Sequence, residues 1–276
     1  MTPDWLEIHR RDAPLVVSFP HTGTDIPADL SGAFHSAWHA KRDADWWVDK
    51  LYDFASALGA TTVRTRISRS VIDVNRDPSG ASLYPGQATT ELCPTTDFDG
   101  APLYRSGREP EAEEIARRRE TFFQPYHDAV RGEIERLRRA HPRVVLFDAH
   151  SIRSHIPRLF DGELPQFNIG TNGNRSCATE LTEAVEAVCA ATGYSRVMNG
   201  RFKGGWTTRH YGQPADGVHA IQLELACRGY IDEPATPAPE NWPTPYSEAR
   251  AADLRKVLKA ILEACVAFAR AGNSVS

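Results

Sequence analysis

The stretch Val144-Val145-Leu146-Phe147-Asp148-Ala149-His150-Ser151 indicates the fold more clearly than any other part of this sequence. Four consecutive apolar residues are typical of a strand that is buried on both faces of a parallel sheet. The polar residues that follow stand at the carboxyl end of that strand, where open α/β sheets carry their chemistry. Asp148 and His150 are two residues apart, so their side chains share one face of the strand. His150 is therefore either a metal ligand or a histidine held by hydrogen bonds at a strand end.

The composition is that of a water-soluble globular protein and predicts a single domain over residues 1–276. Hydrophobic residues make up 41% of the chain and charged residues 25%, and the net charge is −4. A balance so close to neutral gives no reason to expect a nucleic acid or an anionic membrane as partner. The beginning of the sequence lacks the basic end and apolar run of a signal peptide, which predicts a cytoplasmic location. Oligomeric state is not predicted.

The five cysteines form no Cys-x-x-Cys pair. An odd number without such a pair favours neither a disulfide framework nor a thiolate zinc site. A metal ion would therefore be held by histidine and carboxylate.

Apolar runs and helical periodicity alternate along the chain, which predicts one α/β domain with a mostly parallel or mixed sheet and helices on both faces. Residues 77–108 show no periodic pattern, and a loop of that length is more often a functional lid than a spacer. Pro125 is expected to break or bend the longest helix. The predicted strands are 15–19, 61–65, 70–76, 144–151, 167–171 and 218–225, and the predicted helices are 43–58, 109–140, 178–192 and 247–271.

Polar side chains follow several of these predicted strands. His21 comes just after residues 15–19, Asn75 and Arg76 end the run 70–76, and Glu224 lies in an otherwise apolar run. If these ends lie on the same edge of the sheet as His150, they converge on one cleft.

Two histidines and one carboxylate, with a position left for water, form the ligand set of many hydrolytic zinc sites. His21 and His150 are the predicted histidine ligands, and such ligands also accept Mn, Fe or Co. The water in such a site needs a base, and Glu224 in apolar surroundings suits that role because burial raises the pKa of a carboxyl group. The alternative for Glu224 is a buried ion pair with an arginine such as Arg228.

The candidates for the third ligand are Asp45, Asp43, Asp25 and Asp148. Asp45 is preferred because the start of the following helix returns close to the end of its strand, beside His21. Capping of that helix would also explain an aspartate there. Asp43 remains a rival, and Asp148 is better placed to orient a ligand by hydrogen bonding than to bind the metal itself.

Together these segments resemble the N-formylglutamate amidohydrolase family, whose members act in histidine degradation. The resemblance runs from about residue 15 to residue 232 and implies a zinc-dependent enzyme that hydrolyses N-formyl-L-glutamate, a small acidic N-acyl amino acid, to L-glutamate and formate. It is carried by Ser18-Phe-Pro-His-Thr-Gly23, Ser68-Arg-Ser-Val-Ile-Asp-Val-Asn-Arg-Asp-Pro78, Asp148-Ala-His-Ser151, Gly204-Gly-Trp-Thr-Thr-Arg-His-Tyr-Gly212 and Gln222-Leu-Glu-Leu225.

The family is similar in turn to zinc carboxypeptidases and to the aspartoacylase and succinylglutamate desuccinylase group, which implies their fold. By this resemblance Asn75-Arg76 holds a substrate carboxylate, His150 is the second histidine ligand and Glu224 is the base. The sequence departs from the pattern after His21, because Thr24 stands where those enzymes have an acidic ligand. Asp45-Trp46 resembles a displaced form of their Glu-Trp pair.

The two carboxylates of the implied substrate call for at least two arginines, since guanidinium groups bind carboxylates in a bidentate manner. Arg76 is the first choice, Arg209 and Arg69 come next, and Arg201 and Lys203 follow. Arg69 has a second possible role, the stabilisation of a tetrahedral oxyanion. Tyr211 and Asn75 are expected to add hydrogen bonds to the substrate.

Two other functions fit the same residues. One is a deacylase for another N-acyl acidic amino acid, such as N-formylaspartate. The other is a non-catalytic protein that binds a metal or an amino acid on the same scaffold, and such a protein would have no need of Glu224 as a base.

Overall fold

The strand β4, Val144–Ile152, lies at the centre of a seven-stranded sheet, and all its residues are buried. The computed structural model describes residues 2–272. The strands run in the order β1-β3-β2-β4-β7-β5-β6. Neighbours β3, β2, β4 and β7 are parallel, whereas β1 and β5 each pair antiparallel, so the sheet is mixed. The remaining strands are β1 Leu6–His9, β2 Leu15–Phe19, β3 Thr61–Thr65, β5 Phe167–Gly170, β6 Arg196–Met198 and β7 Val218–Ala226.

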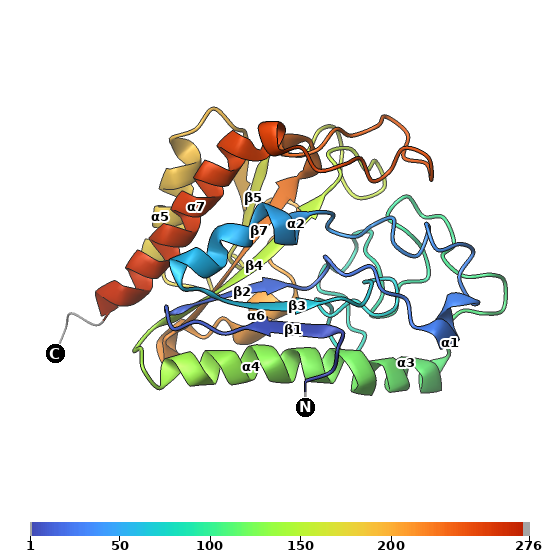
Figure 1. Cartoon of the computed structure of the whole chain (residues 1–276), viewed down its shortest axis with the longest axis horizontal. Helices are drawn as coiled ribbons and strands as arrows, with labels where there is room; N and C mark the ends of the chain where they lie inside the picture. The colour runs from blue at the N-terminus through green and yellow to red at the C-terminus, as the bar shows by residue number, and fades with distance from the viewer. Residues whose placement is uncertain (1, 273–276) are drawn as a thin grey trace.

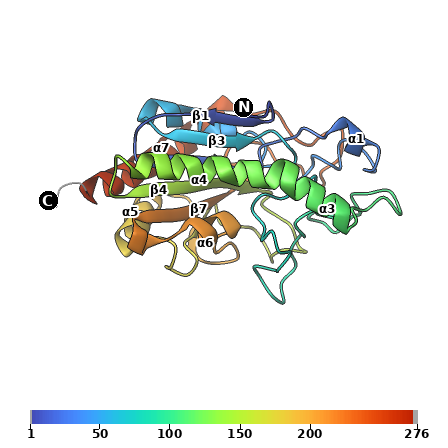
Figure 2. The same ribbon diagram turned by 90° about the horizontal axis from the view of Figure 1, so that it is seen from below.

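Helices cover both faces of the sheet, as predicted (Figure 1). Side chains alternate along β4, so Val145 and Phe147 join the core beneath α5 and α7, while Val144 and Leu146 face the core beneath α4. Figure 2 shows α4 lying along the lower face. The α-helices are α1 Ala28–Ser31, α2 Val48–Leu51, α3 Ala112–Arg118, α4 Gln124–Arg138, α5 Thr179–Ala190, α6 Trp206–Tyr211 and α7 Glu248–Ala271. Short 3₁₀ helices span Asp53–Leu58, Pro214–Asp216 and Cys227–Gly229.

The predicted strand 70–76 is wrong, because this segment forms turns. The carboxylate of Asp73 accepts a hydrogen bond from the backbone N–H of Asn75 at 2.9 Å, and the backbone N–H of Asp73 bonds to the Leu92 carbonyl at 2.7 Å. Side-chain bonds of this kind compete with the ladder of a sheet. The predicted sheet also lacked β1 and β6, which are short strands at its two edges.

The predicted helix 43–58 is reduced to α2 and the 3₁₀ helix Asp53–Leu58. Trp47 adopts a left-handed conformation with φ of 64°, which α-helix does not allow. Asp45 lies before this break, so it is not a helix cap. Its backbone N–H instead donates to the carbonyl of His21 at 2.9 Å.

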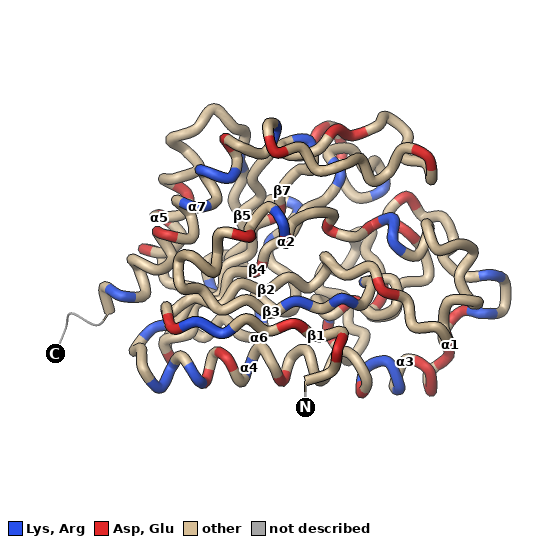
Figure 3. Tube along the Cα trace, in the orientation of Figure 1, with Lys and Arg blue, Asp and Glu red and all other residues tan. Residues whose placement is uncertain are grey.

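The predicted helix 109–140 is continuous but irregular. A π-helical turn, Arg119–Phe123, joins α3 to α4 immediately before Pro125. Proline cannot donate the backbone hydrogen bond of a regular helix, and the wider π-helical turn accommodates the missing bond. The helix therefore changes its geometry near Pro125, where a break or bend was predicted, but it is not broken. Figure 3 shows acidic and basic residues interspersed along α4.

The segment 77–108 contains no helix or strand, as predicted. It lies beyond the carboxyl ends of β2 and β4, among the loops on the right side of Figure 1. All five cysteines are buried and free. Within residues 2–272 no helix has both the length and the apolar character needed to cross a membrane.

The imidazole of His127 on α4 is buried, and its Nε2 atom lies 2.7 Å from the carbonyl oxygen of Val74. Burial lowers the pKa of His127 to about 3, well below its ordinary value of 6.5. The neutral ring therefore stabilises the fold fully above pH 6.5, and this stability is lost as the pH falls toward 3, because only the unfolded chain takes up the proton.

As the pH is lowered from 6.5 to 4, we expect the free energy of unfolding to fall less steeply in His127→Gln than in the parent protein. The difference in slope should approach the contribution of one proton, about 1.4 kcal/mol per pH unit. Urea denaturation at a series of pH values measures both slopes. Parallel profiles would contradict the assignment.

Candidate metal centre and pocket

His21, Asp45 and His150 meet at the carboxyl edge of the sheet. The parallel pairing of β2 with β4 brings His21, just after β2, to the same edge as His150. Asp45 reaches them through its backbone bond to His21, described above, and its carboxylate also accepts a bond from the backbone N–H of Ser151 at 3.2 Å. The three side chains are almost completely buried, with at most 3% of each residue exposed.

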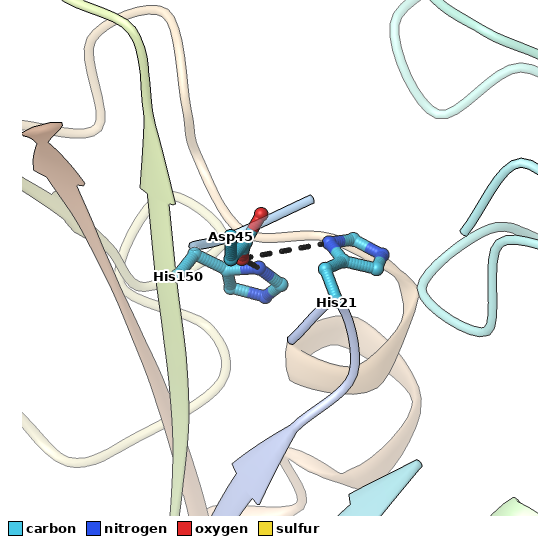
Figure 4. A group of neighbouring side chains, drawn as sticks. All are labelled: His21, Asp45 and His150. Atoms are coloured by element: carbon cyan, nitrogen blue, oxygen red, sulfur yellow. Dashed lines mark hydrogen bonds and ion pairs between the residues drawn. The ribbon is translucent and has the colours of Figure 1, made fainter. Parts of the chain in front are cut away.

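The ligand atoms of these three residues lie within 4.8 Å of one another. Asp45 Oδ2 is 3.0 Å from His150 Nδ1 and 3.8 Å from His21 Nδ1, and Figure 4 shows both contacts. Two polar atoms of the cluster, His21 Nδ1 and Asp45 Oδ1, are buried without a hydrogen-bond partner among residues 2–272. Unpaired buried polar atoms are costly. His21 Nδ1 is such an atom and lies beside Asp45 Oδ2 and His150, which fits a cation site.

The other nitrogen of each histidine contacts a carboxylate. His21 Nε2 lies 2.7 Å from Asp73 Oδ1, and His150 Nε2 lies 2.9 Å from Asp148 Oδ2. Histidine ligands of metals typically donate their second ring N–H to a carboxylate, which fixes the tautomer. In both rings this arrangement leaves Nδ1 as the atom available to a cation. The residues present therefore fit a divalent metal.

Asp73 was not among the residues selected from the sequence, although the pattern Ile72-Asp73-Val74 contains a signal. An acid between apolar residues resembles Asp148 in its strand, and both prove to be fully buried. Burial opposes ionisation of Asp73, but Arg76, His21 and Arg69 together hold its pKa well below the ordinary value. Asp73 is therefore a carboxylate that accepts hydrogen bonds.

Burial and neighbouring charges also shift the pKa values of the two histidines of the cluster, in opposite directions. Burial disfavours the charged form of His150, but Asp148 and Asp45 raise its pKa well above the ordinary value. Burial and the nearby Arg69 lower the pKa of His21.

Asn75 lies behind His150 and is held by the protein itself. Its Oδ1 atom accepts from the backbone N–H of Thr207 at 2.8 Å, which orients the amide, and its Nδ2 atom donates to Asp148 Oδ2 at 3.0 Å. A Cβ atom on Gly205 would lie 2.4 Å from Nδ2, so only glycine permits this approach. The amide thus supports Asp148. Asn75 also lines the pocket, and its bond to substrate stays a prediction.

Glu224 stands opposite His150 in the parallel register of β4 and β7 and lines the pocket. Burial raises the pKa of Glu224 to about 8. Its nearest polar partner is the amide of Gln222, at 3.5 Å. The alternative of an ion pair with Arg228 is wrong, because Arg228 bonds to Ser154 and pairs with Glu163.

The rival acids lie elsewhere. Asp43 accepts a hydrogen bond from the backbone N–H of Phe98 at 2.7 Å, and Asp25 pairs with Arg66 at the surface. Asp148 lies behind His150, as predicted, and also accepts from Ser18 at 2.9 Å. Of the four candidate acids, Asp45 is the one in the cluster.

The pocket beside the cluster contains about 570 Å³ of space, its open mouth included. Arg69, Arg76 and Arg201 line it, together with Glu224, His21 and His150. The loop 84–90 forms part of its wall through Tyr84, Ala88, Thr89 and Thr90.

Arg209 and Tyr211, which were predicted to bind substrate, are not among the residues that line this pocket. Arg209 donates to the carbonyl of Leu83 at 3.0 Å and to that of Gly204 at 2.9 Å, so it ties the residue before loop 84–90 to the segment 204–212. Tyr211 packs beneath the sheet and donates to the backbone carbonyl of His127 at 3.0 Å. Both residues lie on the helix α6.

An α/β sheet that carries a buried His-Asp-His cluster and a desolvated glutamate at one edge is typical of metal-dependent hydrolases of small substrates. Comparison with known families gives a more specific result. The model of the N-formylglutamate amidohydrolase family matches residues 13–231, and the chain belongs to that family.

Individual relatives agree over nearly the whole chain. An N-formylglutamate deformylase of Pseudomonas aeruginosa is 47% identical over 266 residues, which cover 96% of this chain and 97% of the relative. One from Pseudomonas putida is 46% identical over 264 residues, with 95% and 96% covered. The crystal structure of an N-formylglutamate amidohydrolase from Ralstonia eutropha has the same fold, with a TM-score of 0.78 at 24% identity and coverage of 99% and 100%.

Proposed function

We propose that this chain hydrolyses N-formyl-L-glutamate to L-glutamate and formate, as in histidine degradation, with a bound divalent metal, zinc in the first instance. The names of the two Pseudomonas relatives support the substrate. The observation that carries the metal-dependent mechanism is the cluster itself. Two histidine Nδ1 atoms and one aspartate oxygen converge beside a pocket, and each histidine contacts a carboxylate through its other nitrogen.

His21, Asp45 and His150 would hold the ion. When bound, zinc would act as a Lewis acid that polarises the formyl carbonyl and lowers the pKa values of a water molecule and of nearby acids. Asp73 and Asp148 keep the two rings in the required tautomer and orientation.

Glu224 is the proposed general base. It lines the pocket next to His150. A buried glutamate is usually paired with an arginine, but among residues 2–272 no arginine forms an ion pair with Glu224, and Arg69 pairs with Asp45 and Asp73 instead. We infer that Glu224 takes a proton from the attacking water and delivers it to the amine of the departing glutamate. A carboxyl group with a pKa near neutrality suits both transfers.

Arg69 is the proposed oxyanion stabiliser. Its guanidinium donates to Asp73 at 2.7 Å, lies 3.6 Å from Asp45 Oδ1 and faces the pocket. The Phe98 ring, 4.7 Å from the guanidinium carbon, covers its other side. These contacts fix a positive charge beside the cluster before any substrate arrives, which is how electrostatic stabilisation of a transition state is most effective.

The choice of acyl group is testable with N-formyl-, N-acetyl- and N-succinyl-L-glutamate. His150 and Glu224 are neighbours on adjacent strands, so an acyl group between them meets both. We expect kcat/KM to be highest for the formyl compound and at least about tenfold lower for the acetyl compound. Preference for acetyl or succinyl glutamate would instead identify a different deacylase.

The ligand set is testable by metal analysis of purified variants. His21→Ala, Asp45→Ala and His150→Ala should each lose bound zinc, because each removes one of three ligands. Asp43→Ala is the matched control, since Asp43 lies two residues from Asp45 but bonds to the backbone of Phe98, and it should retain zinc. Full zinc occupancy in Asp45→Ala would refute the proposed ligand set.

The role of Glu224 is testable with Glu224→Gln. We expect zinc to be retained and kcat to fall by about 100- to 10,000-fold, the usual contribution of a general base. The control is Glu233→Gln, since burial also raises the pKa of Glu233 but its carboxylate bonds to the backbone of Ser154 outside the pocket. The control should keep normal turnover. An unchanged kcat in Glu224→Gln would leave a binding protein as the better interpretation.

A further inference from the structure

The three arginines of the pocket differ in how far the protein has already neutralised them. Arg69 pairs with Asp73 and Asp45, and Arg76 lies 3.6 Å from Asp73. Arg201 forms no ion pair with any acid in the described part of the chain, and its bonds go to backbone carbonyls, those of Leu159 at 2.8 Å and Ala88 at 2.6 Å.

Those two bonds use Nε and one terminal nitrogen of Arg201, and no hydrogen bond is found for the other terminal nitrogen within residues 2–272. Burial lowers the pKa of Arg201, as expected for a guanidinium that has lost water without gaining an acid. Arg76 and Glu224 line the same pocket as Arg201. A positive charge in this condition is stabilised by an anion from outside the protein.

The position of Arg201 indicates which anionic group that is. Arg69 and Arg76 both contact Asp73, which bonds to His21, so they stand next to the cluster where the amide would be cleaved. Arg201 contacts instead the two loops at the wall of the pocket, through Ala88 and Leu159. In N-formylglutamate the α-carboxylate adjoins the amide, whereas the other carboxylate lies at the far end of the side chain.

We propose that Arg201 binds the side-chain carboxylate of the substrate and so determines the preference for an acidic amino acid. This inference rests on the proposed function and assigns one residue to one group of its substrate. The Arg201 guanidinium also lies 5.3 Å from the centre of the Tyr84 ring, while Arg209 lies 4.9 Å from that centre. Arg209 thus shares the contact with the loop but not the pocket, which makes it the matched control.

The test compares three substrates. N-formyl-L-glutamate has both carboxylates, N-formyl-L-glutamine lacks the side-chain carboxylate, and N-formyl-L-isoglutamine lacks the α-carboxylate. In Arg201→Met we expect kcat/KM to fall about 10- to 100-fold for glutamate and isoglutamine, mainly through KM, as for a lost charged hydrogen bond. The value for N-formyl-L-glutamine should be unchanged. Arg201→Lys keeps the charge and should retain part of the preference.

Arg209→Met should change kcat/KM equally for all three substrates, because it alters only the loop. An equal loss for all three in Arg201→Met would show that Arg201 merely holds the loop. A loss confined to glutamate and glutamine would assign Arg201 to the α-carboxylate and overturn the proposal. The wild-type protein tests the proposed function separately. If it does not turn over N-formyl-L-glutamate, the proposed hydrolysis is refuted, whereas the role of Arg201 is judged from the comparison of the three substrates.

Discussion

The contacts of His21 with Asp73 and of His150 with Asp148 are the interactions on which the rest of the site depends. A buried imidazole has two nitrogens that compete for partners, and a carboxylate on one of them decides which nitrogen remains free. Here both rings are set in the same way. The cluster is thus oriented by residues that do not belong to it, and each of those residues is itself buried and requires partners of its own.

Those partners come from distant parts of the fold. Asp148 accepts from Ser18 on β2, whose hydroxyl also contacts Tyr126 on α4, and from Asn75, whose amide is aligned by the N-terminus of α6. Low polarity in the interior strengthens such bonds and makes any missing partner costly. The network therefore connects α4 and α6, which cover the same face of the sheet, to the cluster.

Much of the scaffold was predictable from the sequence, because β2, β4, β7 and the long helices show strong local patterns. His21, His150 and Glu224 lie at one edge because β2, β4 and β7 are parallel, and that rule needs only the order of strands. Asp45 lies on no strand and joins them through its backbone bond to His21. Asp73 was missed, and Arg209 and Tyr211 were misplaced, for a different reason. Whether residues 70–76 and 204–212 form strand, turn or helix depends on contacts with remote segments, and these contacts decide where each side chain points.

The order of strands in the sheet bears on how the chain acquires its site. Ser18 and Asp148, which bond to each other beside the cluster, are 130 positions apart in the sequence. Closing so long a loop costs conformational entropy that local contacts do not return, and sheets built from such pairings form slowly. The candidate metal centre is therefore a property of the completed fold. A nascent chain that ends before β4, or a fragment released by proteolysis between β2 and β4, carries His21 and Asp45 without the strand that gives them a partner.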